Sequence, residues 1–187
     1  MRLFNHLQPN RLVVFVVLLG ALCLLNACSA QTSPAKVKSL GAPIEGYNHS
    51  GTTAINRFSV NGNGGSNVSV SSGGGQTCCV SMPLTWHPGL TLVVEWEADP
   101  DPLAYISWKE PRSSDAWSKR LADHRTRYTH HRVEVEVAPY EALGVVSVHF
   151  LPCNEIKVTA GVYAPGHPQY PYNYPGNMEE PSQCPSK

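Results

Sequence analysis

The chain has 187 residues, which is enough for one domain with a single hydrophobic core. Its 14 basic residues balance its 14 acidic residues, so the formal net charge is zero when histidine is neutral. A nearly neutral chain gives no electrostatic reason to expect a nucleic acid as partner.

The N-terminal segment, residues 1–27, has the features of a signal peptide. Arg2 and Arg11 precede an apolar run over residues 12–25, which suits a signal-peptide core and is short for a membrane span of roughly 20 residues. The run ends in Leu25-Asn26-Ala27-Cys28, which resembles the lipobox of bacterial lipoproteins. We therefore expect cleavage before Cys28 and lipidation of this cysteine with diacylglycerol and a fatty acyl group. No other cofactor is expected.

Cleavage removes two basic residues and no acidic one, which leaves 160 residues with a net charge of −2. Ser29 follows the cysteine. By the sorting rule known for enteric lipoproteins, a residue other than aspartate at this position implies the outer membrane. We predict a protein anchored by lipid on the periplasmic side of that membrane. Residues 28–43 are small, polar and interrupted by proline, so we expect them to form a flexible lipid-anchored tether.

The body of the chain, residues 44–164, is predicted to be a single β domain. Apolar or alternating runs favour strands at residues 54–60, 67–70, 78–82, 90–97, 103–108, 132–137, 145–151 and 156–162. Glycine-rich turns are expected at residues 61–65 and 71–75. Short strands at a spacing of roughly ten residues, without alternating helices, favour an antiparallel β-sandwich or a barrel-like domain.

One helix and one irregular tail complete the predicted domain. Residues 114–125 are the helix candidate, because Ser114 can cap the first turn and Trp117 lies on the same face as Leu121. Residues 165–187 are rich in proline and tyrosine. We expect them to form an extended, polyproline-like tail, either packed along the domain or free.

Four cysteines remain in the body and tail: Cys78, Cys79, Cys153 and Cys184. An even number in an exported protein predicts two disulfides, for which three pairings exist. Neighbouring residues of a strand point to opposite faces, so we favour separate partners for Cys78 and Cys79, drawn from Cys153 and Cys184. The pairing of Cys78 with Cys79, and of Cys153 with Cys184, stays open. No two of these cysteines have the spacing typical of a zinc site, so no metal is predicted.

Candidate catalytic groups are present but do not form a known motif. The glycine-rich segments lack the Gly-Lys-Ser/Thr spacing of a phosphate-binding loop. His124, His130 and His131 lie close in sequence, and Glu95 with Glu97 and Glu134 with Glu136 form carboxylate pairs. Exposed polar side chains are the simpler interpretation of both groups. We therefore predict no catalytic residues and expect a binding protein rather than an enzyme, with aromatic side chains such as Trp86, Trp108 and Trp117 as candidate contacts.

Several linked motifs resemble one family of bacterial lipoproteins. They are Gly46-Tyr47-Asn48-His49, the run INRFSVNGNGG over residues 55–65, Gly73-Gly74-Gly75 followed by Cys78-Cys79-Val80, and Trp86 with Pro88-Gly89-Leu90. Together they are similar to the family catalogued as domain of unknown function 3304. In that family the Cys-Cys pair recurs, which implies a structural role for the adjacent cysteines and makes a vicinal disulfide more plausible.

The resemblance also implies a function. Proteins of this family are often encoded beside type VI secretion spike proteins and lipase-like effectors. The implied role is that of an immunity protein in the periplasm, which binds and neutralises a lipase or phospholipase effector. The alternative is an accessory structural lipoprotein or an effector adaptor of the secretion system or envelope. Residues 61–65, 71–75 and 108–114 are the candidate contact loops.

Overall fold

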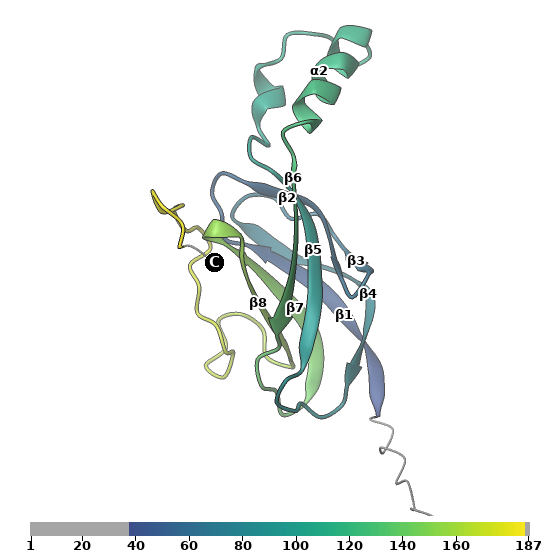
Figure 1. Ribbon diagram of the computed structural model, residues 1–187, viewed down its shortest axis with the longest axis vertical. Helices are drawn as coiled ribbons and strands as arrows, with labels where there is room; N and C mark the ends of the chain where they lie inside the picture. The colour runs from purple at the N-terminus through teal and green to yellow at the C-terminus, as the bar shows by residue number, and fades with distance from the viewer. Residues whose placement is uncertain (1–37, 186–187) are drawn as a thin grey trace, which may run out of the picture. The chain divides into compact units, whose positions relative to one another are not determined.

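The computed structural model describes residues 38–185, and eight strands form the framework of this part of the chain (Figure 1). In chain order the strands are β1 (Ser39–Asn48), β2 (Ala54–Val60), β3 (Asn63–Gly65), β4 (Ser72–Pro83), β5 (Thr91–Asp99), β6 (Thr129–Glu136), β7 (Leu143–Leu151) and β8 (Glu155–Gly161). The helical elements are η1 (Ala104–Ser107), α2 (Asp115–Arg125) and η2 (Pro152–Asn154). The predicted mainly-β fold with one short α-helix is confirmed.

The strands form two four-stranded sheets. One sheet has the order β4-β1-β7-β8 and the other has the order β3-β2-β5-β6. All neighbouring strands run antiparallel except β1 and β7, which are parallel. The arrangement is a two-sheet sandwich and not a closed barrel.

One hydrophobic core lies between the two sheets. It forms because apolar side chains alternate along the strands and so collect on the facing surfaces. Fully buried contributions include Ile44, Val80 and Val148 from the first sheet and Val60 and Val94 from the second. Burial of such side chains stabilises a fold by roughly 1.5–3 kcal/mol each, before conformational entropy is counted.

The first hairpin is tighter than the sequence predicts. β2 turns at Asn61 and Gly62, whose φ angles are 48° and 80°, and returns at once as β3. Positive φ at both central residues is the requirement of a type I′ turn, and Asn-Gly meets it. The strand predicted at residues 67–70 is wrong: only Val68 contributes, through an isolated bridge to Ile55.

β1 begins at Ser39, so residues 39–43, which the sequence places in the tether, belong to the first sheet. Pro43 does not end the strand, because it lies before the pairing with β7 begins at Ile44. On the other side of β1, it lies at a bulge in β4. A proline is tolerated at such a position since no ladder hydrogen bond depends on its missing N–H.

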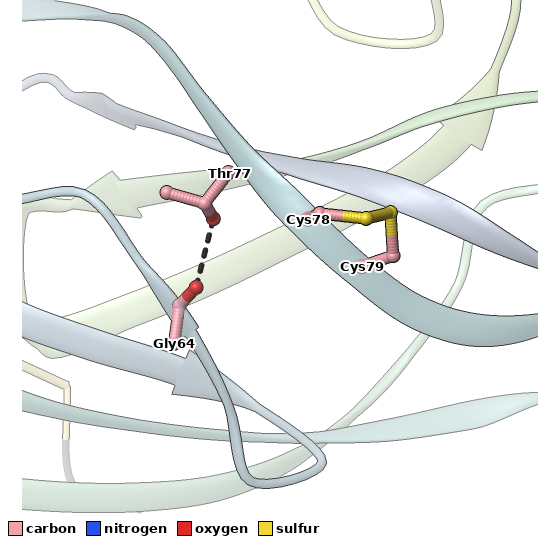
Figure 2. Close-up of a disulfide and its surroundings, with 4 residues drawn as sticks. All are labelled: Gly64, Thr77, Cys78 and Cys79. Atoms are coloured by element: carbon pink, nitrogen blue, oxygen red, sulfur yellow. Dashed lines mark hydrogen bonds between the residues drawn. A yellow bond between two sulfur atoms is a disulfide. The ribbon is translucent and has the colours of Figure 1, made fainter.

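The disulfides are Cys78–Cys79 and Cys153–Cys184, so the favoured separate pairing of Cys78 and Cys79 is wrong. The reason is the bulge in β4. Ala42 pairs with Val80 and Ile44 pairs with Thr77, so two residues of β4 lie opposite one residue of β1. A bulge inserts one extra residue and breaks the strict alternation of side chains. Both cysteines therefore lie on the same side of the strand and can bond (Figure 2).

The C-terminal segment runs over the outer face of the first sheet and is held there by buried aromatic contacts, hydrogen bonds and a disulfide. Tyr170 is buried against this face, and Cys184 is bonded to Cys153. Between residues 165 and 185 the segment has no helix or strand. Within residues 38–185, no helix has the length and apolar character needed to cross a membrane. Residues 1–37, with the predicted signal peptide and Cys28, lie outside the described residues.

Candidate binding surface

The connection between β5 and β6, residues 100–128, leaves the sandwich and forms a helical arm that contains η1 and α2 (Figure 1). Pro100 and Pro102 follow the last residue of β5, and proline cannot continue a strand ladder. The strand predicted at residues 103–108 is wrong, because this segment begins the arm as the 3₁₀ turn η1.

A buried polar cluster fixes the base of the arm. The Asp99 side chain accepts a hydrogen bond from His124 Nε2 at 3.0 Å and another from the backbone N–H of Asp101 at 2.9 Å. The other ring nitrogen of His124 accepts from Arg127, which also pairs with Asp101 at 3.4 Å. The side chains of Asp99 and His124 are each only 7 % exposed. A hydrogen-bonded cluster of this kind holds both ends of the arm at the end of β5.

Within the arm, α2 is well terminated and packs against an aromatic cluster. Ser114 Oγ accepts from the backbone N–H of Trp117 at 3.1 Å, which is the predicted N-cap. The rings of Trp108 and Trp117 meet edge to face with centroids 5.6 Å apart. Arg120 lies over the Trp108 ring and pairs with Glu110 at 2.6 Å. These contacts give the arm internal packing of its own.

The arm exposes a group of apolar side chains on and beside η1. Ile106 is 69 % exposed, Leu103 is 56 % exposed and Tyr105 is 45 % exposed. These three are half of the large hydrophobic side chains that are exposed between residues 38 and 185. Single exposed apolar residues need no explanation, but three within four consecutive positions make this segment the candidate contact surface of the described residues.

Charge is unevenly divided between the arm and the rest of the domain. Residues 100–128 contain six basic and four acidic residues, a net charge of +2. The other described residues contain four basic and ten acidic residues, a net charge of −6. Within the described part of the chain, Lys109 and Arg112 beside η1 form no ion pair. The apolar group is therefore followed in the chain by two basic residues that make no ion pair among the described residues.

The arm and the start of β1 lie at opposite ends of the sandwich (Figure 1). β1 begins at Ser39 and ends at Asn48, whose side-chain amide donates to the carbonyl of Thr53 at 2.7 Å. β2 then begins at Ala54, opposite Asp99 at the base of the arm. The arm thus leaves the end of the sandwich that is distant from Ser39, the first residue of β1.

The candidate catalytic histidines do not converge. His124 belongs to the buried cluster at the base of the arm. His130 lies 3.7 Å from Glu97 on the outer face of the second sheet, and the His131 ring stacks on Trp96 with centroids 4.9 Å apart. His130 and His131 are neighbours in β6, so their side chains lie on opposite faces of the strand.

Three of the four candidate carboxylates pair with a cation or a hydroxyl on the outer face of the second sheet. Glu97 binds Arg57 at 2.6 Å, Glu95 binds Arg132 at 3.1 Å, and Glu134 accepts from Thr91 at 2.6 Å. A hollow of about 440 Å³ lies over the first two pairs. These side chains come from cross-strand positions of an antiparallel sheet, which explains the pairing.

Sequence reasoning missed a buried polar network beneath the C-terminal segment. His149 lies between His49, at 2.9 Å, and the Tyr170 hydroxyl, at 2.5 Å. His49 Nδ1 donates to the Pro175 carbonyl, so the network is complete when both rings are neutral. Burial, with His49 beside it, lowers the pKa of His149 to about 3. The available signals were His149 in a mostly apolar strand and a C-terminal segment rich in tyrosine.

The family comparison agrees with the motifs noted in the sequence. The family model described as "Protein of unknown function (DUF3304)" matches residues 47–158, and the chain belongs to this family. The match includes β2 to β7 and the whole arm. Neither the curated proteins nor the solved structures contain a match to the chain.

Proposed function

We propose that this member of the DUF3304 family is a lipid-anchored periplasmic protein that binds and neutralises a type VI secretion lipase or phospholipase effector. The observation that carries the binding role is the exposed apolar group Leu103, Tyr105 and Ile106 on a well-packed arm. The identity of the partner rests on the family resemblance. The lipid anchor rests on the lipobox-like sequence that ends at Cys28.

The arm has the composition expected of a protein contact. Interfaces are enriched in aromatic residues and arginine, and their energy is concentrated in a few buried anchors. Ile106 and Tyr105 would supply such anchors, and Lys109 with Arg112 would lie at the rim. The matching surface on the partner is an apolar hollow bordered by carboxylates, because opposite charges steer association and fix orientation.

The arrangement of candidate catalytic groups favours binding over catalysis. His124, His130 and His131 lie in three different environments, and Glu95 and Glu97 are each paired with an arginine. A general base must lie within hydrogen-bond reach of its substrate proton, and a nucleophile needs a base beside it. Inhibition by occlusion requires neither.

The position of the arm supports its presentation to a soluble or membrane-bound effector. β1 begins at Ser39 at one end of the sandwich, and the arm leaves the other end (Figure 1). The arm is therefore distant from the first residue of the sandwich.

The test is a titration of residues 29–187, which lack Cys28, into a lipase-like effector encoded beside the gene. Phospholipid hydrolysis is followed at each ratio. We expect inhibition that is complete near one equivalent. Leu103→Asp and Ile106→Asp should each weaken inhibition by tenfold or more, because they place a charge in an apolar contact. Leu40→Asp is the matched control, since Leu40 is 58 % exposed but lies in β1, and it should inhibit normally.

The remaining outcomes separate the alternatives. A stable complex without inhibition would favour the effector-adaptor role. Unchanged hydrolysis without a complex would contradict the immunity function. Equal loss of inhibition with Leu40→Asp and Leu103→Asp would contradict the assignment of the contact to the arm.

A further inference from the structure

The two disulfides of the domain differ in what they can do for the fold. Cys153–Cys184 joins residues 31 positions apart and attaches the C-terminal segment to the end of β7. Cys78–Cys79 joins adjacent residues and closes no loop. In the chain-entropy account, a disulfide stabilises a fold by restricting the unfolded chain, and the effect grows with the length of the closed loop. The Cys78–Cys79 bond therefore adds little to the stability of the fold.

The adjacent pair also requires an irregular strand. The bulge that brings both side chains to one side of β4 removes one residue from the ladder with β1. Val80 is buried and Thr77 reaches the other sheet, so the two cysteines between them lie together on the outer side. Gly41 on β1 leaves room for them: a Cβ at this glycine would lie 3.3 Å from the Cβ of Cys79.

The bond is accessible to a reductant. Cys78 is exposed and Cys79 is half-buried, and β4 is the edge strand of its sheet. Thiol–disulfide exchange needs in-line approach of a thiolate to one sulfur atom, which an exposed edge allows. Pro43, opposite the bulge, has no N–H, so movement of the bulge need not break a hydrogen bond donated by this residue.

We propose that Cys78–Cys79 is a reversible thiol–disulfide exchange site, which takes a dithiol as reductant and whose redox state sets the mobility of the adjoining corner of the sandwich. A thiolate of the dithiol attacks Cys78 Sγ, and the S–S bond breaks with release of the Cys79 thiolate, which takes up a proton. The second thiol of the reductant then attacks the mixed disulfide and releases Cys78. The dithiol loses two electrons and becomes a disulfide, and the protein gains two thiols.

The structural effect of reducing Cys78–Cys79 depends on Thr77, the residue before the pair. Its hydroxyl donates to the carbonyl of Gly64 at 2.7 Å and joins β4 to β3 of the other sheet (Figure 2). Once the bond is open, nothing covalent holds the bulge at residues 78–79. The Thr77–Gly64 contact and the glycine-rich segments 61–65 and 71–75 on either side of it then become more mobile. The proposed exchange site involves no contact of the arm and does not rest on the proposed function.

Linkage predicts which disulfide reacts first. A disulfide that stabilises the folded state is protected from reduction by the same free energy, as we expect for Cys153–Cys184. A disulfide that adds little stability, such as Cys78–Cys79, is protected little. Opening Cys78–Cys79 leaves the C-terminal segment and both sheets in place. Opening Cys153–Cys184 removes the covalent attachment of the C-terminal segment to the end of β7.

The test uses the full chain, purified in detergent and equilibrated with graded ratios of reduced to oxidised dithiothreitol. Free thiols are alkylated and counted for each peptide by mass spectrometry. We expect Cys78 and Cys79 to be half reduced at a ratio at least tenfold lower than Cys153 and Cys184. Reduction of both disulfides at one ratio, or of Cys153–Cys184 first, would overturn the proposal.

Amide hydrogen exchange tests whether reduction of Cys78–Cys79 makes the adjoining segments more mobile. Amide exchange of residues 61–65 and 71–79 should rise on mild reduction and stay unchanged in β7 and β8. The Cys153→Ser/Cys184→Ser variant should keep this response, and the Cys78→Ser/Cys79→Ser variant should lack it. Wild-type exchange that is identical before and after reduction of Cys78–Cys79 would contradict the coupling, whether or not either variant folds.

Discussion

At the scale of single residues, close packing against Phe58 explains why Gly46 and Gly65 are glycines. Phe58 in β2 is buried and lies over two glycines, Gly46 in β1 and Gly65 in β3. A Cβ at Gly65 would lie 2.0 Å from the Phe58 ring, and a Cβ at Gly46 would lie 3.0 Å from it. The ring therefore occupies the space that side chains at these positions would fill.

This packing gives a paired prediction. Gly65→Ala should lower the free energy of unfolding by about 1–3 kcal/mol, because the core must shift to admit the methyl group. Gly64→Ala is the control in the same short strand, since no atom lies within 4 Å of a Cβ built there. Urea denaturation of both variants measures the difference, and equal losses would contradict the steric explanation.

His149 gives a prediction for pH. Its pKa is about 3 in the folded protein and roughly 6.5 in the unfolded chain. Between these values the unfolded state binds a proton that the folded state excludes. Stability should therefore be complete above about pH 6.5 and fall by on the order of 1 kcal/mol per pH unit toward pH 3. Urea denaturation at pH 7.5, 6.0 and 4.5 measures this fall.

The control for pH is His149→Gln, which keeps an acceptor for Tyr170 but cannot titrate. This variant should be less stable at pH 7.5 and lose less further stability on acidification than the wild type. A parallel pH dependence in both proteins would show that other groups, such as carboxylates, determine the acid sensitivity.

At the scale of elements, the arm depends on polar contacts at its base more than on the core. Trp108 and Trp117 pack on each other within the arm, and Asp99 and His124 join the arm to β5. Elements with few buried apolar contacts to the rest of a domain open at lower free energy than its core strands. The hydrogen bonds of Asp99 are therefore the main restraint on the arm's orientation.

Asp99→Ala should loosen the arm without unfolding the sandwich. It leaves the buried His124 Nε2–H without an acceptor, which costs about 1–3 kcal/mol. Amide exchange over residues 100–128 should increase, and that of β1 and β7 should not. Asp123→Ala removes an exposed pair with Lys119 and should cost less than about 0.5 kcal/mol. Similar exchange in the two variants would contradict the anchoring role of Asp99.

Local sequence signals predicted the elements that local rules govern. Alternation located the strands around Ile55, Val94 and Val148, and Ser114 located the start of α2. The segment 103–108 was misassigned because its apolar residues are typical of strands, while its position in the arm depends on the prolines before it and on α2 after it. The bulge at residues 78–79 depends on register with β1, which no local pattern reports.

At the scale of the whole domain, the C-terminal segment covers part of the outer face of the first sheet, where it contacts β7 and β8. Tyr170 is buried on that sheet, and Tyr172 donates to the Val158 carbonyl at 3.1 Å. The sequence indicated an extended segment rich in proline and tyrosine. Its path could not be predicted, because it depends on the polar network around His149 and on the disulfide to Cys153.

The long-range disulfide should account for part of the stability of the whole domain. The Cys153→Ser/Cys184→Ser variant should lose about 3–4 kcal/mol of unfolding free energy, the chain-entropy value for a loop of about 30 residues. The Cys78→Ser/Cys79→Ser variant should lose about 1 kcal/mol or less. Guanidinium denaturation compares them, and equal losses would contradict the distinction between the two bonds.

The parallel pairing of β1 with β7 has a consequence for how the chain acquires its fold. Residues 44–48 of β1 pair with residues 146–150 of β7, so the central contact of the first sheet joins the two ends of the domain. Pairings of such high contact order form slowly, since the loop between them must close first. The first sheet cannot be completed until β7 has been synthesised. The Cys153–Cys184 bond, whose cysteines both lie beyond β7, can close only after that point.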